Sequence, residues 1–309
     1  MGRGAQLGLV KMALSDLPAS QGSRLPEPGR NGENAAANRM MPRYRPISAA
    51  LAIAPTVSVI IPARNEAANL PHVFSTLPPW IDEIILVDGH SIDNTVALTR
   101  VLCPRARVIA QIGEGKGDAL QAGFAAATGD IIVTIDADGS TDGAEIVKFV
   151  GVLVTGADFA KGSRFSGSGR SDDITGVRRC GNRILNTLVN LMFRTRFTDL
   201  CYGYNAFWAH HLDALQINCA GFEIETLMNI RAARLGLKIH EVPSYERRRI
   251  SGTSNLRAIQ DGWRILKVIM REKFSDFREP DLCGLGPTVP IPVPPAVLAE
   301  AANATGEGA

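Results

Sequence analysis

Short apolar runs alternate with longer amphipathic stretches through the first half of the chain. The runs are rich in Ile and Val and are typical of buried strands, at residues 57–61, 83–87, 107–110 and 131–135. Helices are expected between them, up to about Leu77, up to Leu102, and over residues 118–127. Because strands and helices alternate with short connections, the pattern predicts a parallel, doubly wound α/β sheet.

The second half of the chain is less regular. Its pattern predicts strands at 158–161 and 238–242, and helices at 142–154, 177–193, 223–235 and 256–273. The helix at 177–193 carries an apolar stripe of Leu185, Leu188, Val189 and Met192. We interpret this stripe as core packing, with a lipid-facing surface as the alternative.

The two ends of the chain differ in composition from the middle. Residues 1–55 are rich in Gly, Pro, Ser, Asn and Ala without sustained periodicity, and residues 276–309 are Pro-rich and end in small residues. Both ends are expected to be disordered tails. The span 56–275 suits one α/β domain with a sizeable core, so we expect a single domain.

Charge and cysteine content narrow the function classes. The net charge is +2, so bulk electrostatics do not indicate a nucleic-acid partner. Five cysteines without a C-x-x-C spacing argue against a disulfide framework or a zinc site and favour a reducing cytosol. We find no signal-peptide pattern and no run of the ~20 apolar residues that span a bilayer. A soluble or peripheral cytoplasmic protein is therefore expected.

Two carboxylates follow the apolar run at 131–135. Asp136 and Asp138 flank Ala137 and are followed at once by Gly139. In α/β sheets, ligands bind at the carboxyl ends of the strands, and a carboxylate pair there would hold a hard divalent cation against a diphosphate. A plain helix cap is the alternative. Asp88, which ends another strand, favours the ligand site.

The Gly-rich segment at 113–117 matches neither common phosphate-binding loop. A Walker loop requires Ser or Thr after Lys116, where this chain has Gly117. The dinucleotide fingerprint requires a third Gly where Asp118 stands. The sequence therefore supports neither an ATPase nor a dinucleotide oxidoreductase.

Four ordered segments resemble motifs of the family-2 glycosyltransferases that have a GT-A fold: 57–66, 87–95, 115–120 and 129–138. Strings at 162–165, 199–204, 241–243 and 249–254 resemble the dolichol-phosphate (polyprenyl-phosphate) mannose synthase branch. The resemblance covers about residues 56–273. It implies a Rossmann-like GT-A domain with a mostly parallel sheet flanked by helices.

The resemblance also implies roles for residues on the donor side. By position, the nucleotide-sugar would be bound by Pro62, Arg64, Glu66, Asp88, Asp136 and Ala137. Asp136 and Asp138 match the Asp-x-Asp motif that holds Mg²⁺ or Mn²⁺. Arg249 matches a guanidinium directed at the donor diphosphate.

On the acceptor side, Arg164 matches an arginine shared between donor and acceptor phosphates. Arg178 and Asn182 match a pair that receives a lipid phosphate, although this chain has Asn where the branch has Ser. The catalytic residues implied in this way are Asp138, Arg164 and Arg249.

Three functions stay open. The leading hypothesis is an inverting, metal-dependent transfer of a hexose, mannose or glucose, from a GDP- or UDP-sugar to a polyprenyl or dolichyl phosphate. It would act at the inner face of the membrane, through peripheral contact or a membrane-anchored partner. The second hypothesis is transfer of the sugar to a glycan or small-molecule hydroxyl, with Glu223 or Glu225 as the general base. The alternative for these two residues is that they form a solvated helix start. The third is an inactive nucleotide-sugar-binding module, suggested by Gly89 and Ser140, which replace the family's Asp and Gln.

Overall fold

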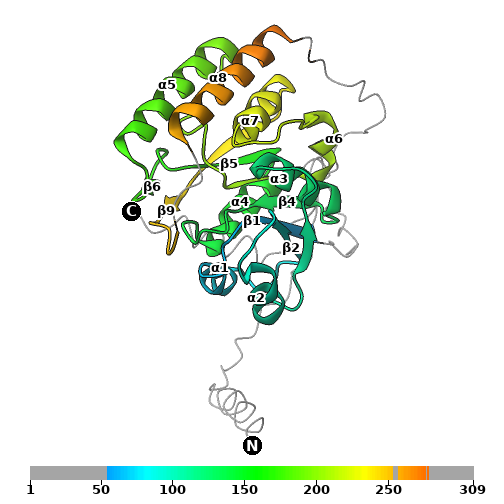
Figure 1. Cartoon of the computed structure of the whole chain (residues 1–309). Helices are drawn as coiled ribbons and strands as arrows, with labels where there is room; N and C mark the ends of the chain where they lie inside the picture. The colour runs from blue at the N-terminus through cyan, green and yellow to red at the C-terminus, as the bar shows by residue number, and fades with distance from the viewer. Residues whose placement is uncertain (1–53, 253–256, 276, 278–309) are drawn as a thin grey trace, which may run out of the picture. The chain divides into compact units, whose positions relative to one another are not determined.

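The computed structural model describes residues 54–252, 257–275 and 277, so nearly all of both expected tails lies outside the described residues. Seven strands form one sheet in the order β3-β2-β1-β4-β7-β5-β8 (Figure 1). They are β1 (Val57–Ala63), β2 (Glu83–Asp88), β3 (Arg107–Ala110), β4 (Ile131–Thr134), β5 (Phe159–Ser163), β7 (Asn205–Trp208) and β8 (Ile239–Pro243). Two short strands, β6 (Arg170–Ser171) and β9 (Tyr245–Glu246), pair separately.

Helices connect most of these strands. They are α1 (Leu70–Thr76), α2 (Thr95–Leu102), α3 (Lys116–Ala126), α4 (Ile146–Val154), α5 (Gly176–Phe193), α6 (Leu212–Leu215), α7 (Ile224–Arg234) and α8 (Ala258–Phe274). Two 3₁₀ turns, η1 (Gly143–Glu145) and η2 (Ala209–His211), precede α4 and α6. The predicted alternation of strand and helix is confirmed.

The sheet is mostly parallel, as predicted, with β7 as the exception. β7 pairs antiparallel with β4 on one side and with β5 on the other. The sequence pattern did not predict this strand, whose four residues, Asn-Ala-Phe-Trp, include no Ile or Val. β7 nevertheless joins the two halves of the sheet.

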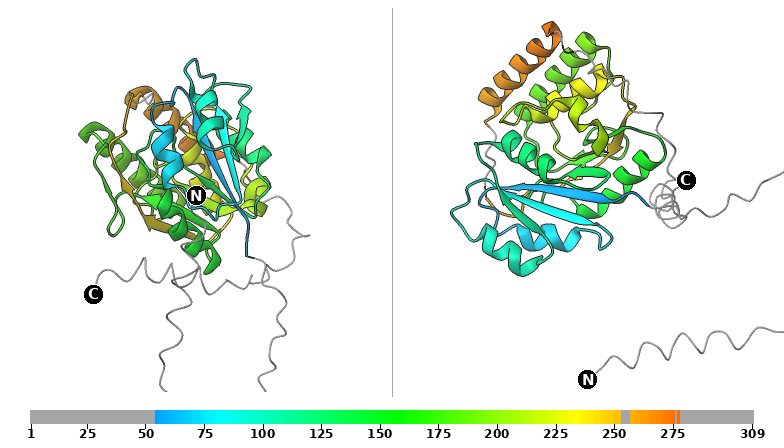
Figure 2. Two further views of the ribbon diagram at one scale, coloured as in Figure 1. Left: turned by 90° about the horizontal axis from the view of Figure 1, so that it is seen from below. Right: turned by 90° about the vertical axis from the view of Figure 1, so that its right-hand side faces the viewer.

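Both faces of the sheet are covered, which explains the continuous apolar strands. Neighbouring residues of β1 point to opposite faces: Val59 and Ile61 pack in the core with α1 and α4, and Ile60 packs with α3 and α7. Figure 2 shows the helices on either side of the sheet. The segments that follow β1, β2, β4 and β5 meet at the carboxyl ends of these parallel strands.

Helices α5, α7 and α8 form a further layer with its own core. Val189 of α5, Ile230 of α7 and Ile269 of α8 are fully buried in this cluster. The predicted stripe of α5 packs against it, so its interpretation as core packing is confirmed. Among the described residues, no helix is both long enough and apolar enough to cross a membrane.

Candidate active site

A cavity of about 560 Å³ lies at the carboxyl ends of β1, β2, β4 and β5. The cavity is lined by the end of β1 and the loop after it (residues 62–66), Gly89, residues 136–138 and Arg164, each at or just after the end of a strand. The remaining wall includes the starts of α3, α5 and α7, Ile265 of α8, the segment before β7, and residues of β9 and after it. A volume of this size is typical of small-molecule sites, which occupy about 300–1,000 Å³.

Asp136 and Asp138 both reach this cavity from the end of β4. Asp136 Oδ1 lies 2.5 Å from the Nζ of Lys116, and Asp138 Oδ2 lies 2.9 Å from a guanidinium nitrogen of Arg249. The alternative that this pair caps the next helix is wrong. Asp142 is the cap, because its side chain accepts the backbone N–H of Ala144 at the start of η1.

Lys116 stands between two carboxylates on the cavity wall. Its Nζ contacts Asp136 and also Glu225 Oε1, at 2.7 Å. Burial alone would lower the pKa of Lys116, but the two carboxylates outweigh it and hold the pKa above its ordinary value. Gly203 makes room for the group, since a Cβ there would lie 2.5 Å from this Nζ. The sequence alone predicted no role for Lys116.

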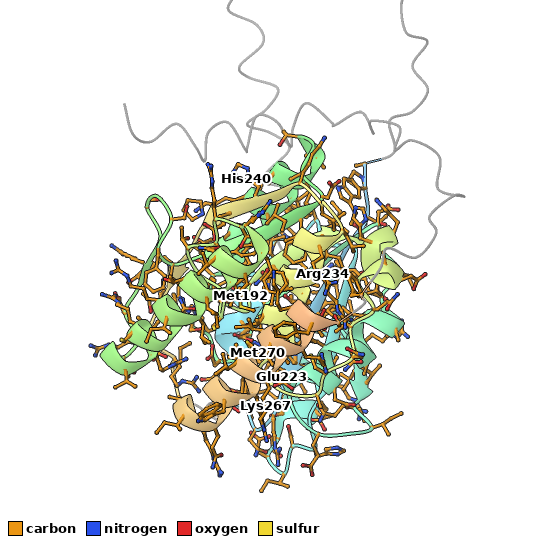
Figure 3. The ribbon with its side chains drawn as sticks, turned by 90° about the horizontal axis from the view of Figure 1, so that it is seen from above. Met192, Glu223, Arg234, His240, Lys267 and Met270 are labelled. Atoms are coloured by element: carbon orange, nitrogen blue, oxygen red, sulfur yellow. The ribbon has the colours of Figure 1, made fainter. Side chains whose placement is uncertain are left out.

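The two candidate bases are placed differently. Glu225 is only 4% exposed and lines the cavity, so the interpretation of a solvated helix start is wrong for it. Glu223, labelled in Figure 3, does not line the cavity and accepts the backbone N–H of Gly221. Only Glu225 can therefore reach a ligand in the cavity.

Arg249 reaches Asp138 because the chain after β9 runs along the loop after β4. The N–H of Arg247 donates to the carbonyl of Ser140 at 2.8 Å, and the N–H of Ile250 donates to the carbonyl of Asp138 at 3.4 Å. These bonds hold Arg249 at the cavity. The rest of this motif, residues 253–254, lies outside the described residues.

Arg164 lines the cavity but is already bonded to two buried carboxylates. Its Nε and Nη2 donate to Asp199 at 2.7 and 2.9 Å, and its Nη1 donates to both oxygens of Glu246 at 3.1 Å. Burial would lower the pKa of Arg164, but these carboxylates raise it. In the described structure this guanidinium therefore faces protein carboxylates, which differs from the expected contact with both phosphates.

The two residues of the expected phosphate-binding pair on α5, Arg178 and Asn182, lie in different surroundings. Arg178 lines the cavity, with its guanidinium 3.5 Å from Asp173. Asn182, one turn further on, is buried and donates to Asp199 Oδ1 at 2.9 Å. It does not line the cavity, because its face of α5 turns toward the Arg164–Asp199 pair. Asn182 therefore supports the wall behind the cavity and is not placed to receive a phosphate there.

The end of β1 and the loop after it form another part of the wall. Pro62, Arg64 and Glu66 line the cavity, whereas Asp88 does not and instead accepts the backbone N–H of Ser91 at 3.3 Å. Burial raises the pKa of the Glu66 carboxyl above its ordinary value, although a hydrogen bond from Asn69 acts in the other direction. Gly89, the residue after Asp88, lines the cavity instead.

The donor set suits a cation that is shared with a phosphate ligand. In the described part of the chain, no three His, Cys, Asp or Glu residues cluster as a metal cage. Asp136 and Asp138 supply two carboxylates at the cavity, and their side chains are 30% and 15% exposed. Mg²⁺ is usually bound in this way, by one or two carboxylates plus substrate phosphates. The pair therefore fits Mg²⁺ or Mn²⁺ only together with a ligand.

Solved structures share this fold. The glucosyl-3-phosphoglycerate synthase of Mycobacterium tuberculosis, crystallised with Mn²⁺, UDP-glucose and glycerol 3-phosphate, aligns with a TM-score of 0.58 and 25% identity. The alignment covers 71% of this chain and 80% of that chain. The GT-A fold expected from the motifs is confirmed.

Sequence relatives identify the family. Glycosyltransferase AglJ of Haloferax volcanii is 30% identical over 221 residues, which are 70% of this chain and 71% of that protein. The dolichol-phosphate mannosyltransferase of Pyrococcus furiosus is 30% identical over 210 residues, which are 65% of this chain but 59% of the longer relative. The family profile of glycosyl transferase family 2 matches residues 58–215. This chain belongs to glycosyl transferase family 2.

Proposed function

We propose that this glycosyltransferase moves a hexose, mannose or glucose, from a GDP- or UDP-sugar to a polyprenyl or dolichyl phosphate. One observation carries the choice of acceptor. Of the six carboxylates among the described lining residues, five lie within 3.5 Å of a Lys or Arg nitrogen: Asp136, Asp138, Asp173, Glu225 and Glu246. The sixth, Glu66, lies on the wall after β1. A hydroxyl acceptor needs a free base, whereas a phosphate is already ionised at neutral pH.

On the donor side, we place the nucleoside against the loop at 62–66 and the diphosphate beside Asp136 and Asp138. A divalent cation bound there would neutralise charge on the leaving diphosphate as a Lewis acid. Arg249 would exchange its bond to Asp138 for a bidentate bond to the diphosphate, a geometry that suits a guanidinium. Lys116 keeps one oxygen of Asp136 occupied and so orients the other.

On the acceptor side, Arg178 would hold the lipid phosphate. A phosphate oxygen attacks the anomeric carbon from the side opposite the diphosphate; the new C–O bond forms as the bond to the diphosphate oxygen breaks. An α-linked donor therefore gives a β-linked product. We assign Arg164 the task of positioning β5, α5 and β9 through Asp199 and Glu246, instead of direct contact with both phosphates.

A second candidate acceptor is a small-molecule or glycan hydroxyl. Two observations favour it: Glu225 lies in the cavity, and the mycobacterial structure with this fold was crystallised with glycerol 3-phosphate. The relative from Pyrococcus, named for dolichol phosphate, supports the lipid acceptor. The two candidates differ in whether Glu225 must act as a base.

The first prediction concerns Asp138. In an assay with Mg²⁺, labelled GDP-mannose or UDP-glucose, and a polyprenyl phosphate in detergent, the label should move to the lipid. Asp138→Asn should lower turnover by about 100-fold or more, because it removes a charge that holds the cation. Asp142→Asn, which lies outside the cavity and changes only the cap of η1 and the pair with Arg247, should stay near wild type. Transfer to a soluble glycan with none to lipid would contradict the proposal, and donor binding without transfer or metal dependence would indicate an inactive module.

The second prediction concerns Arg178. Arg178→Gln should raise the KM for polyprenyl phosphate by about tenfold or more while leaving the KM for the donor within about twofold, since one charge-assisted hydrogen bond to a phosphate is lost. Steady-state kinetics with each substrate varied in turn measures both constants. Arg179→Gln is the matched control, because the neighbouring Arg179 is exposed and does not line the cavity. An equal rise for both substrates would place Arg178 outside the acceptor site.

The third prediction separates the two acceptors. If Glu225 is a general base, Glu225→Gln should lower kcat by about 10²–10⁴-fold. With a phosphate acceptor we expect less than about a tenfold loss, because Asp136 still pairs with Lys116 and no proton must be removed. Glu223→Gln is the control outside the cavity. A loss of kcat in the larger range, together with a new pH dependence, would favour the hydroxyl acceptor.

A further inference from the structure

Helices α5 and α8 carry two apolar stripes that face away from the protein core. On α5 the stripe consists of Val177, Ile184 and Leu191, at intervals of seven residues and 62–80% exposed. On α8 it consists of Ile259, Trp263, Met270 and Phe274, which are 40–78% exposed. This second stripe on α5 is distinct from the core-packing stripe. We call these seven residues and their two helices the α5/α8 face.

The two helices lie side by side and run in the same direction (Figures 1 and 2). Lys273, near the end of α8, donates to the carbonyl of Met192, near the end of α5, at 2.8 Å. Figure 3 looks onto this side of the molecule, with Met192 on α5 and with Lys267 and Met270 on α8. The exposed stripes therefore lie on two adjacent helices.

All exposed charges on these two helices are positive. They are Arg179, Arg183, Arg264, Lys267, Arg271 and Lys273. Helix α5 contains no acidic residue, and the two acidic residues of α8, Asp261 and Glu272, are 5% and 1% exposed. Glu272 also pairs with Arg231 of α7 at 3.0 Å. The face thus combines apolar stripes with flanking cations and presents no exposed carboxylate.

The same two helices border the candidate active site. Arg178 at the start of α5 and Ile265 of α8 both line the cavity. The side chain of Ile265 is 5% exposed and points away from the α8 stripe, toward the interior. A ligand that is held at the α5/α8 face is therefore close to Arg178.

We propose that the α5/α8 face docks on an anionic lipid bilayer. Trp, Phe and aliphatic side chains with flanking Lys and Arg are the composition of helices that lie in the plane of a membrane interface. Anionic headgroups attract nearby Lys and Arg side chains. A second copy of this chain fits less well, because two cationic faces would meet. The inference rests on the proposed function for the identity of the lipid acceptor; docking itself is measured without it.

The test is co-sedimentation of the full chain with vesicles of phosphatidylcholine, with and without phosphatidylglycerol. We expect binding to the anionic vesicles that weakens at high salt, and a blue shift of tryptophan fluorescence that Trp263→Phe abolishes. The variant Leu191→Gln/Trp263→Gln/Phe274→Gln should bind at least about tenfold more weakly, since its three side chains leave the membrane. The double variant Arg183→Gln/Lys267→Gln should lose binding to the anionic vesicles, while its binding to vesicles of phosphatidylcholine alone should not change. Val101→Gln, an exposed position on α2, is the matched control and should bind as wild type.

Three results would overturn the proposal: no vesicle binding by the wild type, equal binding by the triple variant, or a dimer in solution that the triple variant dissociates without any vesicle binding. Activity in detergent with a short polyprenyl phosphate separates this inference from the proposed function. The triple variant should keep that activity, because its residues do not line the cavity. Absence of transfer by the wild type in detergent would defeat the proposed function and leave the docking result standing.

Discussion

Neutralisation of buried charge is the constraint on which the active-site region depends. An unpaired charge in a protein interior costs several kcal/mol, and two cations of the cavity wall, Lys116 and Arg164, are each matched by two carboxylates. Lys116 joins Asp136 and Glu225, and Arg164 joins Asp199 and Glu246. These two groups connect the loops after β4 and β5 with α3, α7 and β9. They hold the wall of the cavity in one arrangement.

The exposure of each ion pair indicates whether its side chains can change partner. The Arg164 pairs are almost fully buried, whereas Arg249 and Asp138 are 19% and 15% exposed at the cavity. A diphosphate and a cation entering the cavity can take over the charges of this exposed pair, and the buried groups keep the scaffold in place. The donor site then lies at the edge of the sheet, and the acceptor site lies beside Arg178, where α5 and α8 begin their exposed face.

The sequence predicted the parts of this arrangement that depend on local pattern. The apolar runs located the parallel strands, and Asp136 and Asp138 were found because they end one of them. The pairing of Lys116 with Glu225 and of Arg164 with Glu246 was missed, because partners 109 and 82 residues apart leave no local spacing to read. β7, which has no Ile or Val, was missed as well. The outer stripe of α5 was overlooked because one apolar residue every seven positions is a weak signal beside the core stripe.

The central claim is that the Asp136/Asp138 edge holds the donor diphosphate through a divalent cation and frees Arg249 to contact it. A crystal structure with Mn²⁺ and GDP or UDP, with Mn²⁺ located by its anomalous signal, tests this most directly. We expect Mn²⁺ between Asp138 and the diphosphate oxygens, with the Arg249 guanidinium moved from Asp138 to the diphosphate and the Lys116 pairs unchanged. A nucleotide bound elsewhere, or Arg249 still paired with Asp138 beside a bound diphosphate, would contradict the account.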